Sequence, residues 1–336
     1  MKTLSLTLVS CLLLTACSSE SDDASTDESI DWKIESLSPT FEQFIAPNAQ
    51  VEVLASGFTW SEGPLWLESQ QKLIFSDVPE NKIYQWNPSN DSLSVYLTPS
   101  GYTGSETQSK EPGSNGLALD PDGNLVLCQH GNRQLALMAS PLTQPEPEFL
   151  TLASTYKEQS FNSPNDVAIS SKGSYFFTDP PYGLNDPSES DLGHFGVYRL
   201  DADGNVELLI DSLTRPNGIA LSPDEETLYI AVSDPEAARY YAYQLDENQQ
   251  VTNGKMLLDV TALGKERKGL PDGMKVHSSG NLFATGPGGV LVLSPEGEHL
   301  GTIMTGFATA NCAFDSEEKY LYMTAHKHLM RIALID

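Results

Sequence analysis

Six residues that carry an oxygen donor recur at the same place in a repeated sequence pattern. They are Glu62, Asn115, Asn165, Asn217, Asp272 and Asn311, spaced by roughly 50 residues. The set holds two carboxylates and four amides, with no Lys, Arg or Cys. Such oxygens suit hard cations, and Ca²⁺ fits best because it accepts several neutral oxygens in irregular geometry, whereas Zn²⁺ prefers His and Cys. The pattern therefore predicts oxygen coordination of a divalent metal.

An ordinary turn is the alternative interpretation of each position, because Asn-Gly and Asp-Gly pairs tolerate positive φ. Glu62 is a poor turn former, however, and the repeats have separate hairpin turns at "DPDG", "SSKG", "SPDE" and "SSGN". We therefore interpret the first sites as ligands and the second sites as turns. Asn311 lacks a following Gly, so we expect it to line the ring without binding the metal.

The elements that position these residues are short strands. Each repeat has a polar residue, an apolar strand, a turn and a second strand rich in β-branched or aromatic residues, followed by two further strands in most repeats. A period near 50 without sustained helical periodicity predicts propeller blades. We predict an all-β, six-bladed β-propeller with four-stranded blades, in which a strand at positions 50–58 closes the ring as the outer strand of the last blade. The first strand of a blade is innermost, so the six residues should surround the axis at one mouth of the channel.

Three further residues are candidates for contact with a substrate. His130 and Arg133, in "CQHGNRQ", end the second strand of the second blade beside the mouth. They could contact hydroxyls or the carboxylate of a sugar acid, or they could be a loop-stabilising His and a surface Arg. Tyr182, in "TDPPYGL", precedes a long polar loop that could be a lid, or the motif could simply pack a turn.

The N-terminal residues predict export. A lysine at position 2, an apolar run that is too short to span a bilayer, and "LTAC" ending at Cys17 are typical of a bacterial lipoprotein signal at residues 1–16. A plain secretory signal with a chance cysteine is the alternative. We expect lipidation of Cys17, an acidic flexible tether over residues 17–45, and the propeller over 46–336, facing the periplasm or the cell surface, with the lipid as its only membrane contact. The remaining cysteines, Cys128 and Cys312, fall in blades that are not neighbours, so we expect no disulfide.

The charge balance excludes one class of partner. The chain has 46 acidic and 19 basic side chains and a formal net charge of −27, which argues against nucleic acid because phosphate backbones are bound by an excess of Lys and Arg. We expect a small-molecule ligand and a monomer or dimer.

Several motifs carry a resemblance to a known family. In order, "EGPLW", "SNGLALDPDGNL", "HGNR", "SPNDVAI", "FTDPPYGL", "RPNGIALSPD", "PDGMKV" and "GNLFATGPGGV" resemble the gluconolactonase / senescence-marker-protein / regucalcin-like family, especially bacterial gluconolactonases, over about residues 50 to 336. The resemblance implies a six-bladed propeller, lactone hydrolysis and a divalent metal, with Ca²⁺ first and Zn²⁺, Mg²⁺ or Mn²⁺ as alternatives. It also implies that Glu62, Asn217 and Asp272 bind the metal directly. Asn165 matches a position that is a ligand in some members and a substrate contact in others.

The predicted activity is metal-dependent hydrolysis of a sugar lactone. A metal bound to the ester oxygen stabilises the developing oxyanion, and Asp272, the position usually proposed as base or nucleophile, would take the proton. Asn115, His130, Arg133 and Tyr182 are the predicted substrate contacts. The alternatives are a calcium-dependent phosphotriesterase-like hydrolase, a non-enzymatic ligand-binding propeller, and a strictosidine-synthase-like fold that would not need the carboxylates.

Overall fold

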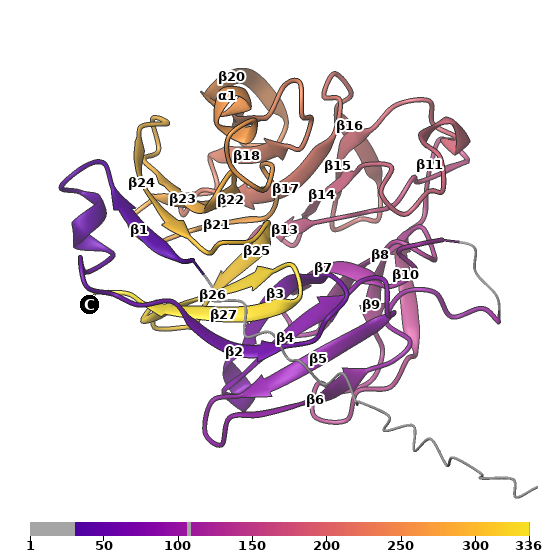
Figure 1. Ribbon diagram of the computed structural model, residues 1–336. Coiled ribbons are helices and arrows are strands. Elements are labelled where there is room, and N and C mark those ends of the chain that lie inside the picture. Colours follow the sequence, from indigo (N-terminus) through magenta and orange to yellow (C-terminus); the bar gives the residue numbers. More distant parts are fainter. Residues whose placement is uncertain (1–30, 106–108, 336) are drawn as a thin grey trace, which may run out of the picture. The chain divides into compact units, whose positions relative to one another are not determined.

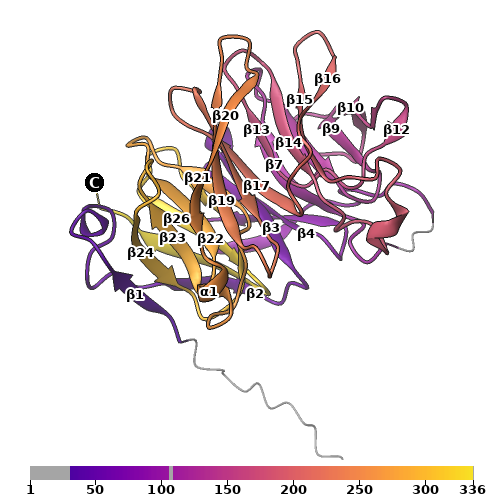
Figure 2. The same cartoon turned by 90° about the horizontal axis from the view of Figure 1, so that it is seen from above.

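The described part of the chain consists of antiparallel sheets arranged around one axis (Figures 1 and 2). A computed structural model describes residues 31–105 and 109–335, and within them six sheets form the blades. The first blade holds β3 (Ser61–Leu67), β4 (Lys72–Asp77), β5 (Lys82–Asn87) and β6 (Ser92–Leu97). The second holds β7 (Ser114–Leu119), β8 (Leu125–Gln129), β9 (Gln134–Met138) and β10 (Phe149–Ala153). The third holds β13 (Val167–Ile169), β14 (Tyr175–Asp179), β15 (Gly196–Leu200) and β16 (Val206–Ile210).

The second half of the ring repeats this plan. The fourth blade holds β17 (Pro216–Leu221), β18 (Thr227–Val232), β19 (Arg239–Leu245) and β20 (Val251–Asp259). The fifth holds β21 (Met274–Val276), β22 (Leu282–Gly286), β23 (Gly289–Leu293) and β24 (His299–Met304), and the sixth holds β25 (Thr309–Phe314), β26 (Tyr320–Ala325) and β27 (His328–Ala333). Short elements fill the connections: η1 (Phe41–Gln43), η2 (Glu68–Gln70), β11 (Thr155–Tyr156), β12 (Gln159–Ser160), η3 (Pro187–Glu189) and α1 (Thr261–Gly264). The predicted all-β, six-bladed propeller is confirmed.

The ring closes through a strand from the N-terminal side. β2 (Glu52–Ser56) pairs antiparallel with β27, so the sixth sheet runs β2-β27-β26-β25 (Figure 1). A hydrogen bond of 2.7 Å joins Ser56 Oγ to His328 Nδ1 at this seam. The predicted closing strand is thus confirmed, and the innermost strands of the six blades contact one another in sequence around the axis.

The fifth blade carries one strand more than predicted. β1 (Lys33–Ser36) pairs with β24 and extends that sheet to five strands (Figure 1). Phe41 and Ile45 are fully buried, and the Phe41 ring packs on the Cα of Gly301. The expectation of a flexible tether up to residue 45 does not hold for residues 33–45, because their apolar side chains bury against the fifth blade although the preceding composition is acidic.

Apolar side chains between neighbouring blades form most of the core. Between the first and second blades, for example, Leu67, Ile74, Leu117 and Leu127 belong to one buried cluster, and similar clusters lie between other blade pairs. Each such side chain contributes about 1.5–3 kcal/mol by leaving water. This packing on both faces of the blades fixes the innermost strands, and hence the residues at their starts, with little freedom.

Two other predictions concern cysteines and membranes. Cys128 in β8 and Cys312 in β25 are buried free thiols, and burial raises the pKa of Cys312 to about 12.

Over residues 31–105 and 109–335, none of the helices is long and apolar enough to cross a bilayer. The predicted signal peptide, Cys17 and the first part of the tether lie outside the described residues.

Candidate active site at the axis

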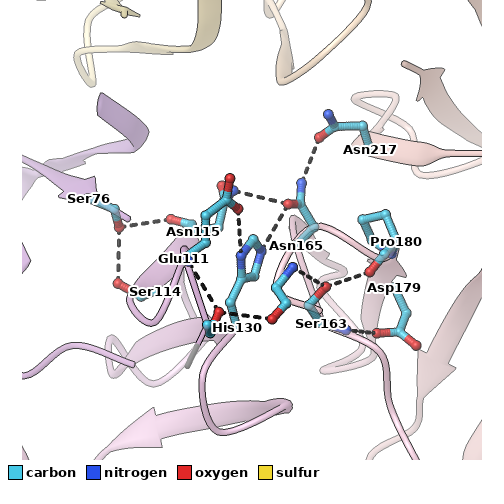
Figure 3. A network of polar contacts seen from close by, with 12 residues as sticks. Ser76, Glu111, Ser114, Asn115, His130, Ser163, Asn165, Asp179, Pro180 and Asn217 are labelled. Atoms are coloured by element: carbon cyan, nitrogen blue, oxygen red, sulfur yellow. Dashed lines mark hydrogen bonds and ion pairs between the residues drawn. The ribbon is translucent and has the colours of Figure 1, made fainter. Parts of the chain in front are cut away.

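Three of the repeated amides form a continuous chain of hydrogen bonds across blades two to four (Figure 3). Asn115 Nδ2 donates to Asn165 Oδ1 at 3.0 Å, and Asn165 Nδ2 donates to Asn217 Oδ1 at 2.6 Å. Asn217 Nδ2 then donates to Ser233 Oγ at 2.8 Å. The predicted convergence of these positions at the axis is therefore observed for the three amides, which come from the starts of three successive blades.

Glycine lets neighbouring blades approach this closely. A Cβ on Gly218 would lie 2.1 Å from the carbonyl oxygen of Asp272, and one on Gly273 would lie 2.0 Å from Cγ of Asn311. Real Cβ contacts are never so short, and the obstructing atom at Gly218 is backbone, so any larger residue there would push the next blade outward. The glycine after the ring residue thus sets the spacing between Asn217 and Asp272.

Carboxylates at the ends of second strands hold the loops that lead into the ring. Asp179, the last residue of β14, accepts hydrogen bonds of 2.8 and 2.7 Å from the backbone N–H groups three and two positions before Asn165. Asp77, the last residue of β4, accepts two hydrogen bonds of 3.1 Å from the backbone N–H groups of Thr59 and Trp60, which likewise lie three and two positions before Glu62. The repeat therefore contains both the residue at the axis and the carboxylate that holds the loop before it.

Hydroxyl groups next to these carboxylates link the first blade to the second and the third to the fourth. Ser76 Oγ donates to the carbonyl oxygen of Asn115 at 2.9 Å, and Thr178 Oγ1 donates to that of Asn217 at 2.6 Å. Both hydroxyls occupy the penultimate position of a second strand. The hydroxyls and the residues whose carbonyl groups they contact are all buried. These bonds therefore hold the backbone at Asn115 and at Asn217 in place from the preceding blade.

Two carboxylates face the same space and are difficult to ionise together. Burial and the neighbouring negative charges of Asp166 and Glu111 raise the pKa of Glu62. Burial, and then the charge of Glu62, raise the pKa of Asp272 well above its usual range. Asp166, whose pKa burial also raises, adds to the negative potential at the axis. A site with several buried carboxyl groups favours protons or a metal cation.

A cavity of about 600 Å³ opens over this cluster. Its walls include the predicted residues Glu62, Asn115, Asn165, Tyr182, Asn217 and Asp272. Asn115 Oδ1 is buried and makes no hydrogen bond to the described residues, and the buried Tyr182 hydroxyl lies beside the polar side chains of Ser233 and Asn217 without a well-aligned hydrogen bond to either. Burial, and then the charge of Asp272, raise the pKa of Tyr182. The cavity thus offers a hydroxyl donor and an amide acceptor beside the two carboxyl groups.

The cavity walls also contain functional groups that the sequence analysis missed. They are Trp60, Glu111, Arg215, Ser233, Arg267 and Lys268. Trp60 and Arg215 each stand two positions before a residue of the repeated set, Glu62 and Asn217. Comparing that position across the repeats would have identified both. The others lie in connections or strand ends that have no repeated signal, so their position depends on the path of the folded chain.

Two predicted substrate contacts do not line the cavity. His130 is fully buried, with Nε2 3.1 Å from Asn165 Oδ1 (Figure 3). Arg133 forms a 3.0 Å salt bridge with Asp191 and also donates to the carbonyl oxygen of Phe161. This arrangement gives neither side chain direct contact with a molecule in the cavity.

The donor set fits a hard cation better than a transition metal. Among the described residues there is no group of three or more His, Cys, Asp or Glu arranged to hold a metal, so a metal here would depend on the amides. Glu62 and Asp272 supply charge, and Asn217 supplies an amide oxygen. Asn115 Oδ1 is a further oxygen in the wall that has no hydrogen-bond partner. Both lone pairs of Asn165 Oδ1 face other groups, Asn115 Nδ2 and His130 Nε2.

Fold and site together define the class: a six-bladed β-propeller with a cluster of carboxyl and amide groups in an axial cavity. The chain belongs to the SMP-30/Gluconolactonase/LRE-like region family, whose family model matches residues 60–327. A gluconolactonase of Zymomonas mobilis is 38% identical over 309 residues, which cover 89% of this chain and 85% of that protein. A regucalcin of Bos taurus is 26% identical over 81% of this chain and 85% of its own length. A solved gluconolactonase structure from Xanthomonas campestris has a TM-score of 0.78 and 29% identity, covering 91% of this chain and 96% of that one.

Proposed function

We propose that this protein hydrolyses a sugar lactone in the axial cavity. The observation that carries the proposal is the pair of buried carboxyl groups, Glu62 and Asp272, in one cavity with unpartnered hydrogen-bonding groups. The similarity to proteins named gluconolactonase over most of their length supports the same reaction. The cavity volume of about 600 Å³ lies within the range of small-molecule sites.

We further propose that the active protein holds one divalent cation, with Ca²⁺ as the best match. Glu62, Asn217 and Asp272 are the residues that would hold it, because they give two charges and a neutral oxygen. The cation would polarise the ester carbonyl and balance the negative charge that develops on its oxygen. A role for Asn165 as an additional ligand stays a prediction.

The chain's own residues divide the remaining work. Asp272 is the group that takes a proton from the attacking water, since its carboxyl faces the cavity and binds protons readily when no cation is near. Asn115 Oδ1 accepts a hydrogen bond from a sugar hydroxyl, and the Tyr182 hydroxyl donates one to a ring or hydroxyl oxygen. The first assignment rests on an amide oxygen that is buried in the cavity wall without a partner, and the second on a buried hydroxyl in the same wall without a well-aligned hydrogen bond.

We propose that the protein acts outside the cytoplasm, held to a membrane through lipid on Cys17. The support is the sequence of residues 1–17, with one lysine, a short apolar run and "LTAC". Labelling cells with a palmitate analogue would show lipid on the wild type and none on Cys17→Ser, whereas an unlabelled wild-type protein would contradict the anchor.

A pH-stat assay of glucono-1,5-lactone hydrolysis, corrected for spontaneous opening, tests the catalytic proposal. We expect turnover with Ca²⁺, its loss with a chelator, and a reduction of at least about 100-fold in Asp272→Asn and Glu62→Gln. Glu148→Gln, an exposed carboxylate on the second blade, is the matched control and should behave as the wild type. Full activity of both site variants would refute the proposed centre. Turnover of a phosphotriester but not of a lactone would assign the cavity to the other hydrolase class, and metal binding with neither activity would make it a binding site.

A further inference from the structure

A buried histidine connects a cavity carboxylate to the central amide of the ring (Figure 3). Glu111 Oε2 lies 3.2 Å from His130 Nδ1, and His130 Nε2 lies 3.1 Å from Asn165 Oδ1. The His130 side chain is fully buried, while that of Glu111 is 34% exposed at the cavity wall. The imidazole of His130 therefore lies between Glu111 at the cavity wall and the amide of Asn165.

The chemistry of the two neighbours defines what the imidazole must do. An ionised carboxylate and an amide oxygen both accept hydrogen bonds and cannot donate them. Nε2 of His130 is thus placed to donate to Asn165 Oδ1. Nδ1 makes no hydrogen bond but lies within ion-pair distance of the Glu111 carboxylate, which is the charged group beside this buried imidazole.

The orientation of the Asn165 amide determines the orientation of its neighbours. With Oδ1 toward His130, Nδ2 donates to Asn217 Oδ1 at 2.6 Å. Asn217 Nδ2 then faces Ser233 Oγ, and that hydroxyl donates to the carbonyl oxygen of Pro271, the residue before Asp272. If the Asn165 amide were reversed, its NH₂ group would face the Nε2 hydrogen of His130 and its oxygen would face Asn217 Oδ1. Both contacts would become repulsive, so the donor direction is set at the histidine end of the chain.

We propose that Glu111 and His130 are positioning residues that fix the amide orientation of Asn165. Through Asn165 they fix the orientation of Asn217, one of the residues proposed to hold the cation. Glu111 acts through His130 although it lines the cavity, and His130 acts without contact with the substrate. The cation and turnover parts of this inference rest on the proposed function. The hydrogen-bond pattern itself does not.

A double-mutant cycle tests the proposal. Glu111→Gln and His130→Leu should each lower Ca²⁺ affinity, measured by isothermal titration calorimetry, by about 10- to 100-fold. Each should also lower kcat more than it changes KM. The double variant should lose less Ca²⁺ affinity than the product of the two single losses, because part of the effect of Glu111 passes through His130 and only the rest acts through its charge at Glu62 and Asp272. His130→Gln, which keeps an N–H donor, should recover part of the loss, and Glu148→Gln should match the wild type.

Other outcomes would overturn the proposal. If Glu111→Gln raised KM at unchanged kcat, and its effect multiplied that of His130→Leu, Glu111 would contact the substrate directly. If His130→Leu folded and kept wild-type Ca²⁺ affinity, the histidine would have no positioning role. Should His130→Leu fail to fold, Glu111→Gln and His130→Gln still decide, since both keep a polar group in place.

A measurement without metal or substrate separates this proposal from the catalytic one. In ¹⁵N-histidine-labelled protein, a slowly exchanging Nε2–H signal should belong to His130, and Glu111→Gln should change its chemical shift. Absence of an Nε2–H signal for His130 in the wild type would refute the proposed donor pattern whether or not the protein hydrolyses lactones. Absence of turnover with this signal present would refute the proposed function and leave the hydrogen-bond pattern intact.

Discussion

Replacing Gly218 by alanine should damage both stability and the site. The added Cβ would lie 2.1 Å from the carbonyl oxygen of Asp272, and reaching an ordinary contact of 3.4 Å requires a shift of about 1.3 Å. The obstructing atom is backbone of the fifth blade, so no side-chain rotation relieves it. Overpacking of this kind costs about 1–3 kcal/mol, and a 1 Å displacement of a catalytic group lowers turnover by about 100-fold.

Urea unfolding followed by tryptophan fluorescence, together with the lactonase assay, measures both effects. We expect Gly218→Ala to lose about 2–3 kcal/mol of unfolding free energy and about 100-fold in kcat/KM. Gly264→Ala is the matched control, because its Cβ would meet nothing closer than 3.7 Å, and its stability should stay within about 0.5 kcal/mol of the wild type. If Gly218→Ala kept wild-type stability and turnover, the claim that glycine sets the spacing between Asn217 and Asp272 would be wrong.

Three further predictions follow from charges in and around the site. Because burial and neighbouring carboxylates raise the pKa of Glu62 and Asp272, Ca²⁺ binding at pH 7 should release protons, and fewer at pH 9; calorimetric heats that are equal in buffers of different ionisation enthalpy at pH 7 would contradict this. Burial raises the pKa of Asp179 to about 7 from 3.8, so its folded form binds a proton that the unfolded chain has lost, and its stabilising effect should disappear as the pH rises from 4 through 7. The change is about 4 kcal/mol, and unfolding curves of Asp179→Asn should lack this part of the pH dependence; an unchanged slope would exclude Asp179 as its source. Glu35→Gln should cost about 1 kcal/mol and raise KM, because it weakens the two hydrogen bonds that hold Arg267 in the cavity wall; urea unfolding and steady-state kinetics measure the two effects, and an unchanged KM would show that this wall position does not depend on the pair.

Much of the architecture could be predicted from the sequence because its signals are local. Each blade repeats a polar residue, a strand, a turn and a strand within a short window, and the leftover strand at positions 52–56 had one open edge to fill. The ring positions followed from the same register.

What could not be predicted depends on contacts between distant segments. β1 is four residues long and follows an acidic stretch, so neither its composition nor its periodicity distinguishes it from a tether. His130 was predicted to lie beside the mouth and to contact the substrate, but its contacts with Asn165 and Glu111 depend on the path of the loop that carries Glu111. The cations Arg267 and Lys268 lie in a connection without a repeat, where local sequence says nothing about direction.

The seam between β2 and β27 imposes an order on synthesis. Its bonded residues Ser56 and His328 are separated by 272 positions, so at ribosomal rates β2 emerges roughly 15 to 55 s before the strand that will cover it. During that interval β2 is an unpaired edge, open to pairing with another chain. The ring is therefore completed only when almost the whole polypeptide has been made, and a chain that stops short of its last strand leaves the propeller open.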